Sequence, residues 1–185
     1  MNAIGLYRTA RWLYVHHIPV LPKVLKGVTY LIFNSVIPYT AEIGDETKFA
    51  YGGIGCVVHA RAKIGKRVII GQNSTIGRSL DPEDFPTIGD DVYISAGARI
   101  IGNINVGNNV IIGANAVVNK SVEESCIVAG VPARVIRKID VSIWELLKNI
   151  SFSNMGGGRL YPLIVSHGIF SKQWNWQYVD FRFQN

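Results

Sequence analysis

The stretch from Thr87 to Val122 reads TIGDDVYISAGARIIGNINVGNNVIIGANAVVNKSV, and its spacing decides the fold. An aliphatic residue recurs in it at every sixth position. The same spacing extends back to Val58, with one interruption at Pro82. The matching residues are Val58, Ile64, Ile70, Ile76, Ile88, Ile94, Ile100, Val106, Ile112 and Val118. A fixed period of this kind predicts a repeat architecture.

Each group of six residues supplies one short strand and one turn. The aliphatic residue points inward, and the residue after it is often glycine or another small residue. Glycine and asparagine tolerate the backbone conformations that a tight corner requires. Three such hexads make one coil, and stacked coils pair every strand with the strands above and below. The sequence therefore predicts an all-β fold, a parallel β-helix.

Two segments depart from the period. The register of Ile37 and Ile43 slips by three residues before Val58, so the segment 50–57 (AYGGIGCV) is irregular. The segment 78–87 contains the run DPEDFP, and prolines are not expected in a paired inner strand. We expect this second segment to be an extruded loop, and loops on a rigid scaffold often carry functional sites.

The two ends of the coil need caps, because an unpaired strand edge invites further pairing. Residues 1–36 predict short amphipathic α-helices, residues 37–139 the β-helix, and residues 140–185 a C-terminal helical and aromatic extension. In the second helix we expect Leu25, Val28, Leu31 and Ile32 to form the packed face. Ser142 is the expected N-cap of a short helix that ends near Lys148.

Composition limits the function classes. The 185 residues carry a net charge of +6, but the basic residues are scattered, so nucleic-acid binding is not expected. No apolar run is long enough to span a bilayer, which predicts a cytoplasmic protein with at most peripheral membrane contact. Cys56 and Cys126 lie seventy positions apart and are expected to be reduced and buried.

The run AGVPAR at residues 129–134, together with the repeats, resembles the closing motif of a known family. Over residues 37–138 the chain resembles the left-handed β-helix acyltransferases with hexapeptide repeats, in the branch of serine acetyltransferase and the polysaccharide O-acetyltransferases. The resemblance implies a left-handed helix, a homotrimer, and acetyl-CoA bound as acyl donor in a groove between coils. It also implies transfer of the acetyl group to a hydroxyl.

The family's cofactor positions transfer to this sequence by motif. The pantetheine would run along Gly77, Arg78, Ala96 and Ala114, where small residues let an extended chain lie close to the backbone. Lys120 and Arg134 would meet the CoA phosphates, which suit an ammonium and a guanidinium group. The alternative for the two alanines is simple corner packing, and for Lys120 a solvated turn.

His59 is the candidate catalytic base. It is the only one of the chain's four histidines in the repeat region, and it occupies a turn position next to the irregular segment. Imidazole has a pKa suited to taking a hydroxyl proton near neutral pH. Asp81, Glu83 and Asp84 in the expected loop are available to orient it. The alternative for His59 is a structural histidine, and for the acids a solvated turn.

The acceptor is predicted from departures from serine acetyltransferase. That enzyme has an Asp-His pair where this chain has Tyr51 and Gly52, and a loop histidine where this chain has Phe85. Tyr51, Gly52 and Phe85, together with Asp84, are the predicted acceptor-binding residues. Their identities favour a sugar hydroxyl in surface polysaccharide biosynthesis, and serine is the alternative acceptor.

Two other classes stay open. A non-catalytic β-helix scaffold is one. The other is a γ-class carbonic anhydrase, which shares the coil but needs three histidines for zinc. Only one histidine lies in these repeats, so no metal is expected.

Overall fold

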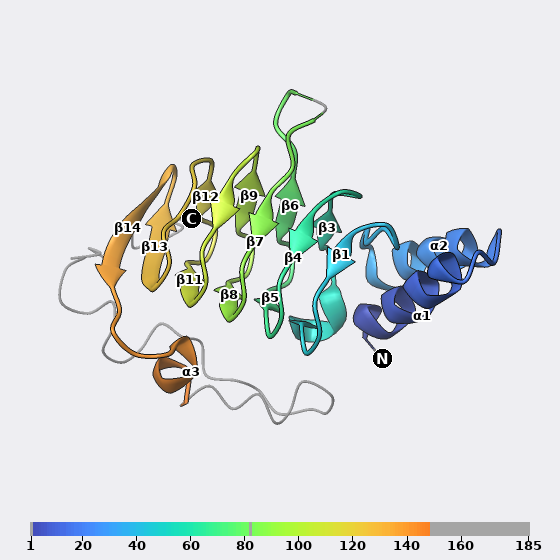
Figure 1. Ribbon diagram of the computed structural model, residues 1–185, viewed down its shortest axis with the longest axis horizontal. Helices are drawn as coiled ribbons and strands as arrows, with labels where there is room; N and C mark the ends of the chain where they lie inside the picture. The colour runs from blue at the N-terminus through green and yellow to red at the C-terminus, as the bar shows by residue number, and fades with distance from the viewer. Residues whose placement is uncertain (1, 82, 149–185) are drawn as a thin grey trace, which may run out of the picture.

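A computed structural model describes residues 2–81 and 83–148, and it confirms the predicted left-handed parallel β-helix. Short strands stack along one axis, with two helices at the N-terminal end (Figure 1). No helix in the described residues is long and apolar enough to cross a membrane. The predictions for residues 149–185, including the aromatic extension, lie outside the described part.

Three sheets form the walls of the coil. The first sheet contains β1 (Glu42–Ile43), β4 (Lys63–Ile64), β7 (Thr87–Ile88) and β10 (Asn105–Val106). The second contains β2 (Lys48–Phe49), β5 (Ile69–Ile70), β8 (Val92–Ile94), β11 (Val110–Ile112), β13 (Cys126–Gly130) and β14 (Ala133–Lys138). The third contains β3 (Val57–Val58), β6 (Thr75–Gly77), β9 (Arg99–Ile101) and β12 (Val117–Val118). The chain visits the sheets in the order first, second, third, and then begins the next coil.

The strand register explains both irregular segments. In a regular coil, Ile94 pairs with Ile112, 18 residues later. Phe49 instead pairs with Ile70, so three residues are added, and they fall at the 3₁₀ turn η1 (Ala50–Gly53). Ile64 pairs with Ile88, so six residues are added, and they form a loop between β6 and β7 that projects from the coil (Figure 1). The predicted slip and the predicted extruded loop are both confirmed.

The interior of the prism is a stack of aliphatic side chains. All ten predicted inward residues are buried, and Ile70, Ile76, Ile94, Ile100 and Ile112 are fully enclosed. Burying such a side chain contributes about 1.5–3 kcal/mol to folding. Coils approach closely at the corners, since a Cβ added to Gly71 would lie 2.5 Å from the backbone nitrogen of Ala96. Cys56 and Cys126 are buried free thiols, as predicted.

At the corner between the first and second sheets, residues other than glycine adopt the left-handed backbone conformation. Its residues with φ between +53° and +60° are Glu46, Arg67, Asp91, Asn109 and Ser125. Such a conformation costs about 1–3 kcal/mol outside glycine. Side-chain bonds between coils offset part of this cost. Arg67 donates from Nε and a terminal nitrogen to the two carboxylate oxygens of Asp91, at 2.7 and 2.6 Å.

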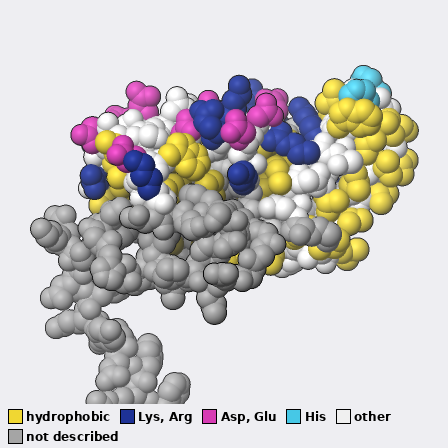
Figure 2. Space-filling model, turned by 90° about the horizontal axis from the view of Figure 1, so that it is seen from below, with side chains coloured by type: hydrophobic (Ala, Val, Ile, Leu, Met, Phe, Trp, Pro, Cys, Tyr) yellow, Lys and Arg dark blue, Asp and Glu magenta, His cyan; other side chains and the backbone are white. Residues whose placement is uncertain are grey.

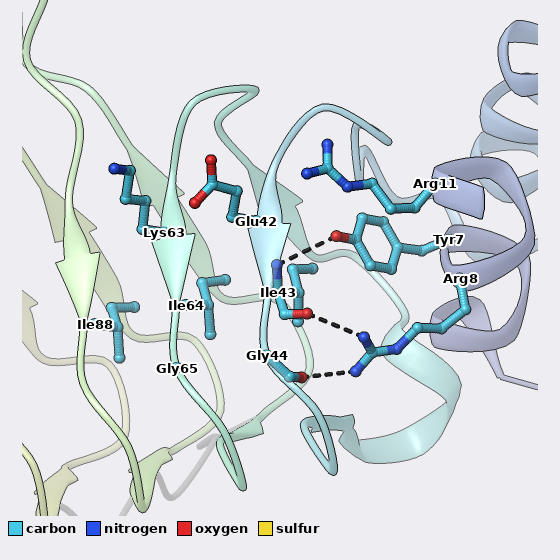
Figure 3. A pocket seen from close by; sticks show the side chains of 10 residues that line it. All are labelled: Tyr7, Arg8, Arg11, Glu42, Ile43, Gly44, Lys63, Ile64, Gly65 and Ile88. Atoms are coloured by element: carbon cyan, nitrogen blue, oxygen red, sulfur yellow. Dashed lines mark hydrogen bonds between the residues drawn. The ribbon is translucent and has the colours of Figure 1, made fainter. Parts of the chain in front are cut away.

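Helix α1 (Ala3–Val15) caps the first coil. Its Tyr7 hydroxyl donates to the Ala41 carbonyl oxygen at 2.7 Å and accepts from the backbone nitrogen of Ile43 at 3.2 Å. Arg8 donates to the carbonyl oxygens of Ile43 and Gly44 at 3.0 and 2.6 Å (Figure 3). These bonds satisfy the edge of β1, which would otherwise be open to another strand.

Helix α2 (Leu21–Phe33) packs on α1, and only half of the predicted face takes part: Leu25 and Val28 are half-buried. Its buried residues are Pro22, Thr29 and Phe33, whereas Leu31 is 82% exposed and Ile32 is also exposed. Lys23, Lys26 and Tyr30 occupy one side of the helix, and the apolar stripe on the remaining side is wider than the packed face, so periodicity predicted exposed residues as well.

The C-terminal end is closed by an antiparallel strand. The AGVPAR motif forms the turn from β13 into β14, and β14 runs back along β13 and ends the parallel stacking. The following helix α3 (Ile143–Leu146) has Ser142 as its N-cap, as predicted, with the hydroxyl accepting from the Trp144 backbone nitrogen at 3.3 Å. A second apolar cluster holds this helix: Ile127, Ile139, Ile143 and Leu147.

Candidate active site

His59 lies at the corner where the chain leaves the third sheet. Its backbone nitrogen donates to the carbonyl oxygen of Ile76 at 2.7 Å, which fixes the corner to the next coil. The side chain is half-buried. One coil further on, the extruded loop leaves β6 from the corresponding corner, so the loop and the histidine share one edge of the sheet.

The loop folds back over His59. The Phe85 ring lies nearly parallel to the imidazole, with ring centroids 6.4 Å apart. The guanidinium carbon of Arg61 lies 4.6 Å from the centroid of Phe85, and a terminal nitrogen of Arg61 is 2.7 Å from Oε2 of Glu83. We name Arg61, Glu83 and Phe85 the Arg61 clamp. It connects the histidine corner to the loop.

The surroundings of His59 favour the neutral imidazole. Burial lowers the pKa of His59 below its ordinary value, and the positive charges of Arg78 and Arg61 lower it further. A general base must be unprotonated before it acts, so this shift keeps the ring competent near neutral pH. The environment therefore suits proton abstraction.

The hydrogen bond to the ring identifies the basic nitrogen. The backbone nitrogen of Arg61 donates to Nδ1 of His59 across 3.3 Å. A neutral imidazole that accepts at Nδ1 carries its proton on Nε2. In this tautomer the basic nitrogen Nδ1 already accepts the bond from Arg61, so the ring can take a hydroxyl proton at Nε2 only in the other tautomer, which carries its proton on Nδ1.

The predicted orienting acids are occupied elsewhere. Glu83 pairs with Arg61, Asp84 accepts from the hydroxyl of Ser79, and Asp81 accepts from the backbone nitrogen of Glu83. Within residues 2–81 and 83–148, none of these three carboxylates bonds to His59. The three carboxylates are engaged by Arg61, Ser79 and a backbone nitrogen of the loop, so in the described part of the chain they do not orient the ring.

The predicted cofactor residues lie along two edges of the third sheet. Gly77, Arg78 and Lys120 share the corner of His59. Ala96 and Ala114 lie at the other corner, where the chain enters the third sheet from the second, and the Asn115 nitrogen donates to the Ala96 carbonyl oxygen at 3.0 Å. Arg134 reaches the end of this second edge, because it pairs with Ala129 of β13.

The extruded loop causes this division. Arg78, Ala96 and Ala114 are 18 residues apart and would form one column if every hexad belonged to a coil. Six residues of the loop lie outside the coil, so Ala96 and Ala114 are displaced by one wall of the prism. A single chain therefore does not bring the predicted cofactor residues into one cluster.

The predicted acceptor residues divide in the same way. Phe85 lies beside His59, and Asp84 adjoins it in the loop. Tyr51 and Gly52 lie in η1, at the opposite edge of the third sheet, with φ of 51° and 75°. Tyr51 is exposed and Gly52 is buried.

Sequence reasoning missed Arg61. Its position two residues after His59, with an acidic loop to follow, was the available signal. The structure gives it three roles, since its backbone bonds to the imidazole, its side chain binds the loop, and its charge lowers the pKa of His59.

A cavity of 450 Å³ lies beside α1, over β1 and β4 (Figure 3). Arg8, which lines this cavity, donates to the carbonyl oxygens of Ile43 and Gly44, and Arg11 donates to that of Tyr39. These bonds attach α1 to the first coil, so the cavity belongs to the N-terminal cap. Among the described residues, no group of three His, Cys, Asp or Glu side chains could hold a metal ion.

Comparisons with known proteins agree with this architecture. Residues 85–120 match the bacterial transferase hexapeptide family (six repeats). The chain is 35% identical to the serine acetyltransferase of Synechococcus elongatus over 77% of this chain and 59% of that protein. It is 32% identical to the serine acetyltransferase of Staphylococcus aureus over 77% of this chain and 68% of that protein.

Solved structures give the same result. A serine acetyltransferase from Vibrio cholerae superposes with a TM-score of 0.71 at 31% identity, over 78% of this chain and 56% of that one. A serine acetyltransferase from Brucella abortus in complex with coenzyme A gives 0.71 at 34% identity, over 76% and 56%. The chain thus spans little more than half the length of these solved relatives.

Proposed function

Because this chain belongs to the hexapeptide-repeat acyltransferases, in the branch of the serine acetyltransferases, we propose that it transfers an acetyl group from acetyl-CoA to a hydroxyl group. The observation that carries the proposal is His59, a half-buried histidine with a lowered pKa at a coil corner beside Phe85 of the extruded loop. The relative solved with coenzyme A supports acetyl-CoA as the donor.

In the proposed reaction, the acceptor oxygen attacks the thioester carbonyl carbon while His59 takes the hydroxyl proton. The carbon–sulfur bond then breaks, and the proton passes to the departing CoA thiolate. The products are an acetyl ester and CoA. The lowered pKa of His59 supports this sequence, because the ring begins it unprotonated.

The proposed active unit is a homotrimer. In one chain the third sheet separates the edge with His59, Arg78 and Lys120 from the edge with Ala96 and Ala114. A groove between neighbouring chains would join the first edge of one chain to the second edge of the next. The pantetheine would then lie against the alanines, and Lys120 and Arg134 would bind the CoA phosphates.

For the acceptor, the comparisons favour serine over the sugar predicted from the sequence. Curated relatives and solved neighbours are serine acetyltransferases, one of them in complex with cysteine. The charge of Arg78 beside His59 also suits an acceptor with a carboxylate, whereas that of Arg61 is paired with Glu83. We therefore propose serine as the first acceptor to test.

A sugar hydroxyl is the second candidate. It rests on Tyr51, Gly52 and Phe85, which replace the histidines and the aspartate that serine acetyltransferase has at these positions. A nucleotide sugar would place phosphates, instead of a carboxylate, near Arg61 and Arg78.

The test is a CoA-release assay with acetyl-CoA and a panel of L-serine, free sugars, UDP-sugars and oligosaccharides. A thiol reagent suits the assay, because both cysteines are buried and the pKa of Cys56 is raised to about 11. His59→Asn should reduce turnover of the best acceptor by roughly 100-fold or more. The matched control is His17→Asn, since His17 is exposed and asparagine tolerates its positive φ.

The outcomes separate the alternatives. Turnover of serine alone would support the serine acetyltransferase activity, and turnover of a saccharide would support the second candidate. Full activity of the His59→Asn enzyme would exclude His59 as the base. No turnover with any hydroxyl acceptor would favour a non-catalytic scaffold.

A further inference from the structure

The helical end of the molecule exposes a continuous apolar surface. On α2 and its N-cap, Val20, Val24 and Leu31 are 67%, 50% and 82% exposed. Their spacing places them on one side of the helix, opposite the buried Pro22, Thr29 and Phe33. Leu21 and Ile32 extend this side. We name Val20, Leu21, Val24, Leu31 and Ile32 the α2 face.

Helix α1 adds amphipathic aromatic residues to the same end. Trp12 and Tyr14 are exposed, and so are Val15 and Ile18 in the turn toward α2. Figure 2 shows hydrophobic side chains covering this end of the molecule, whereas charged side chains gather along the coil. Contiguous apolar surface of this kind marks an interaction site, in contrast to scattered exposed residues.

The charge of this end has one sign. Residues 2–41 contain no aspartate or glutamate, and their basic residues are Arg8, Arg11, Lys23 and Lys26. The two arginines are engaged with backbone carbonyls, and Arg8 also forms an ion pair with Asp45 at 3.5 Å. Lys23 and Lys26 form no ion pair within the described residues. Any partner of the helical end therefore meets uncompensated positive charge beside an apolar face.

The lysines line a hollow next to the α2 face. A cavity of 520 Å³ is bounded by Lys23, Lys26, Tyr30, Ser35 and Tyr39, among others. Two ammonium groups and the hydroxyls of Tyr30 and Tyr39 offer several hydrogen-bond donors to a phosphate, whereas the buried Ser35 hydroxyl bonds to backbone carbonyls of the fold. The hollow thus fits an anionic headgroup.

From this juxtaposition we propose that the α1–α2 hairpin docks on the surface of a membrane containing anionic phospholipid. The α2 face enters the boundary between headgroups and acyl chains, Trp12 and Tyr14 lie at headgroup level, and Lys23 and Lys26 bind lipid phosphates. Each helix has 13 residues, which suits lying on a bilayer and is too short to span one.

Charge favours a membrane over a second copy of the chain. Two copies joined through this face would bring four lysines together with no acidic residue from either hairpin to neutralise them. A phosphate-rich surface neutralises the lysines and receives the apolar side chains as well. The proposal does not rest on acetyl transfer, because only the hairpin is involved.

The test is co-sedimentation of the full chain with vesicles of phosphatidylcholine, with and without phosphatidylglycerol. Binding is expected only to the anionic vesicles and should weaken as salt is added. Lys23→Gln with Lys26→Gln should weaken binding roughly 30-fold, at about fivefold per lysine. Val24→Asn with Leu31→Asn should weaken it at least about tenfold, since both apolar side chains lose their burial in the bilayer.

The matched control is Lys66→Gln, an exposed lysine on the coil that should leave vesicle binding unchanged. Circular dichroism and size-exclusion chromatography check that every variant keeps its fold and oligomeric state. The proposal is overturned if anionic vesicles do not bind the protein, or if neither pair of substitutions weakens binding. A larger oligomer that Leu31→Asn dissociates would overturn it in favour of a second copy.

Discussion

Replacing Arg61 with glutamine should release the loop that lies over His59. The Arg61 guanidinium makes an ion pair with Glu83 at 2.7 Å and packs 4.6 Å over Phe85. The paired side chains are 51% and 73% exposed, so the ion pair contributes about 0.2–1 kcal/mol. The cation–π contact at an exposed site adds about 0.5–1 kcal/mol. If catalysis requires the closed loop, losing both contacts costs about 0.7–2 kcal/mol and lowers kcat/KM roughly three- to thirtyfold.

The assay is steady-state acetyl transfer over a range of pH. Glu83→Gln removes only the ion pair and should cost at most about fivefold in kcat/KM. Arg137→Gln removes an exposed arginine of β14 and serves as the control. Because Arg61 lowers the pKa of His59, Arg61→Gln should also move the acid limb of the kcat/KM profile to higher pH. An Arg61→Gln enzyme with unchanged kcat/KM and an unchanged acid limb would refute the role of the clamp.

The other predictions concern the electrostatics of His59 and the core. Arg78 lowers the pKa of His59, so the wild-type acid limb should lie below the ordinary histidine value, and Arg78→Gln should raise it while Arg78→Lys preserves it. A pH profile of kcat/KM checks this, and an acid limb that Arg78→Gln leaves in place would contradict it. Ile94 is fully buried, so Ile94→Ala should lower the free energy of unfolding by about 2–5 kcal/mol in chemical denaturation, whereas the outward, half-buried Ile111→Ala should cost clearly less. Equal costs at the two positions would show that the prism interior does not carry the stability assigned to it.

The fold could be predicted because the interior of the prism imposes a strict period. Every coil repeats the same three inward positions, so residues as far apart as Ile94 and Ile112 report on one geometric constraint. Breaks in the six-residue period also located the two insertions, at η1 and at the loop between β6 and β7. The packed face of α2 was less predictable, because the apolar stripe of this helix is wider than the part that packs, so Leu31 and Ile32 follow the period and are nevertheless exposed.

The site was harder to predict because it depends on how many residues leave the coil. Counting in steps of 18 places Ala96 on the same corner as Arg78, and this count fails once six residues are extruded. The Arg61 clamp could not be predicted from the sequence for a related reason. Its contacts with Glu83 and Phe85 arise only because the loop folds back on the corner from which it starts, a fact of tertiary structure that local pattern does not contain.

The sizes of the two insertions explain how a site can be added to so regular a core. A loop of six residues equals one period, so Ile76 and Ile88 on either side both remain inward and buried. The other insertion has three residues, which would shift the inward positions if it lay within a strand. It lies at the η1 corner instead, where Gly52 and Gly53 adopt positive φ, and the pairing between strands is not interrupted. Only β3 separates the first insertion from His59, and the second insertion folds over it. The chain therefore departs from its repeat on both sides of the one histidine in its coil, at positions where the aliphatic stack is undisturbed.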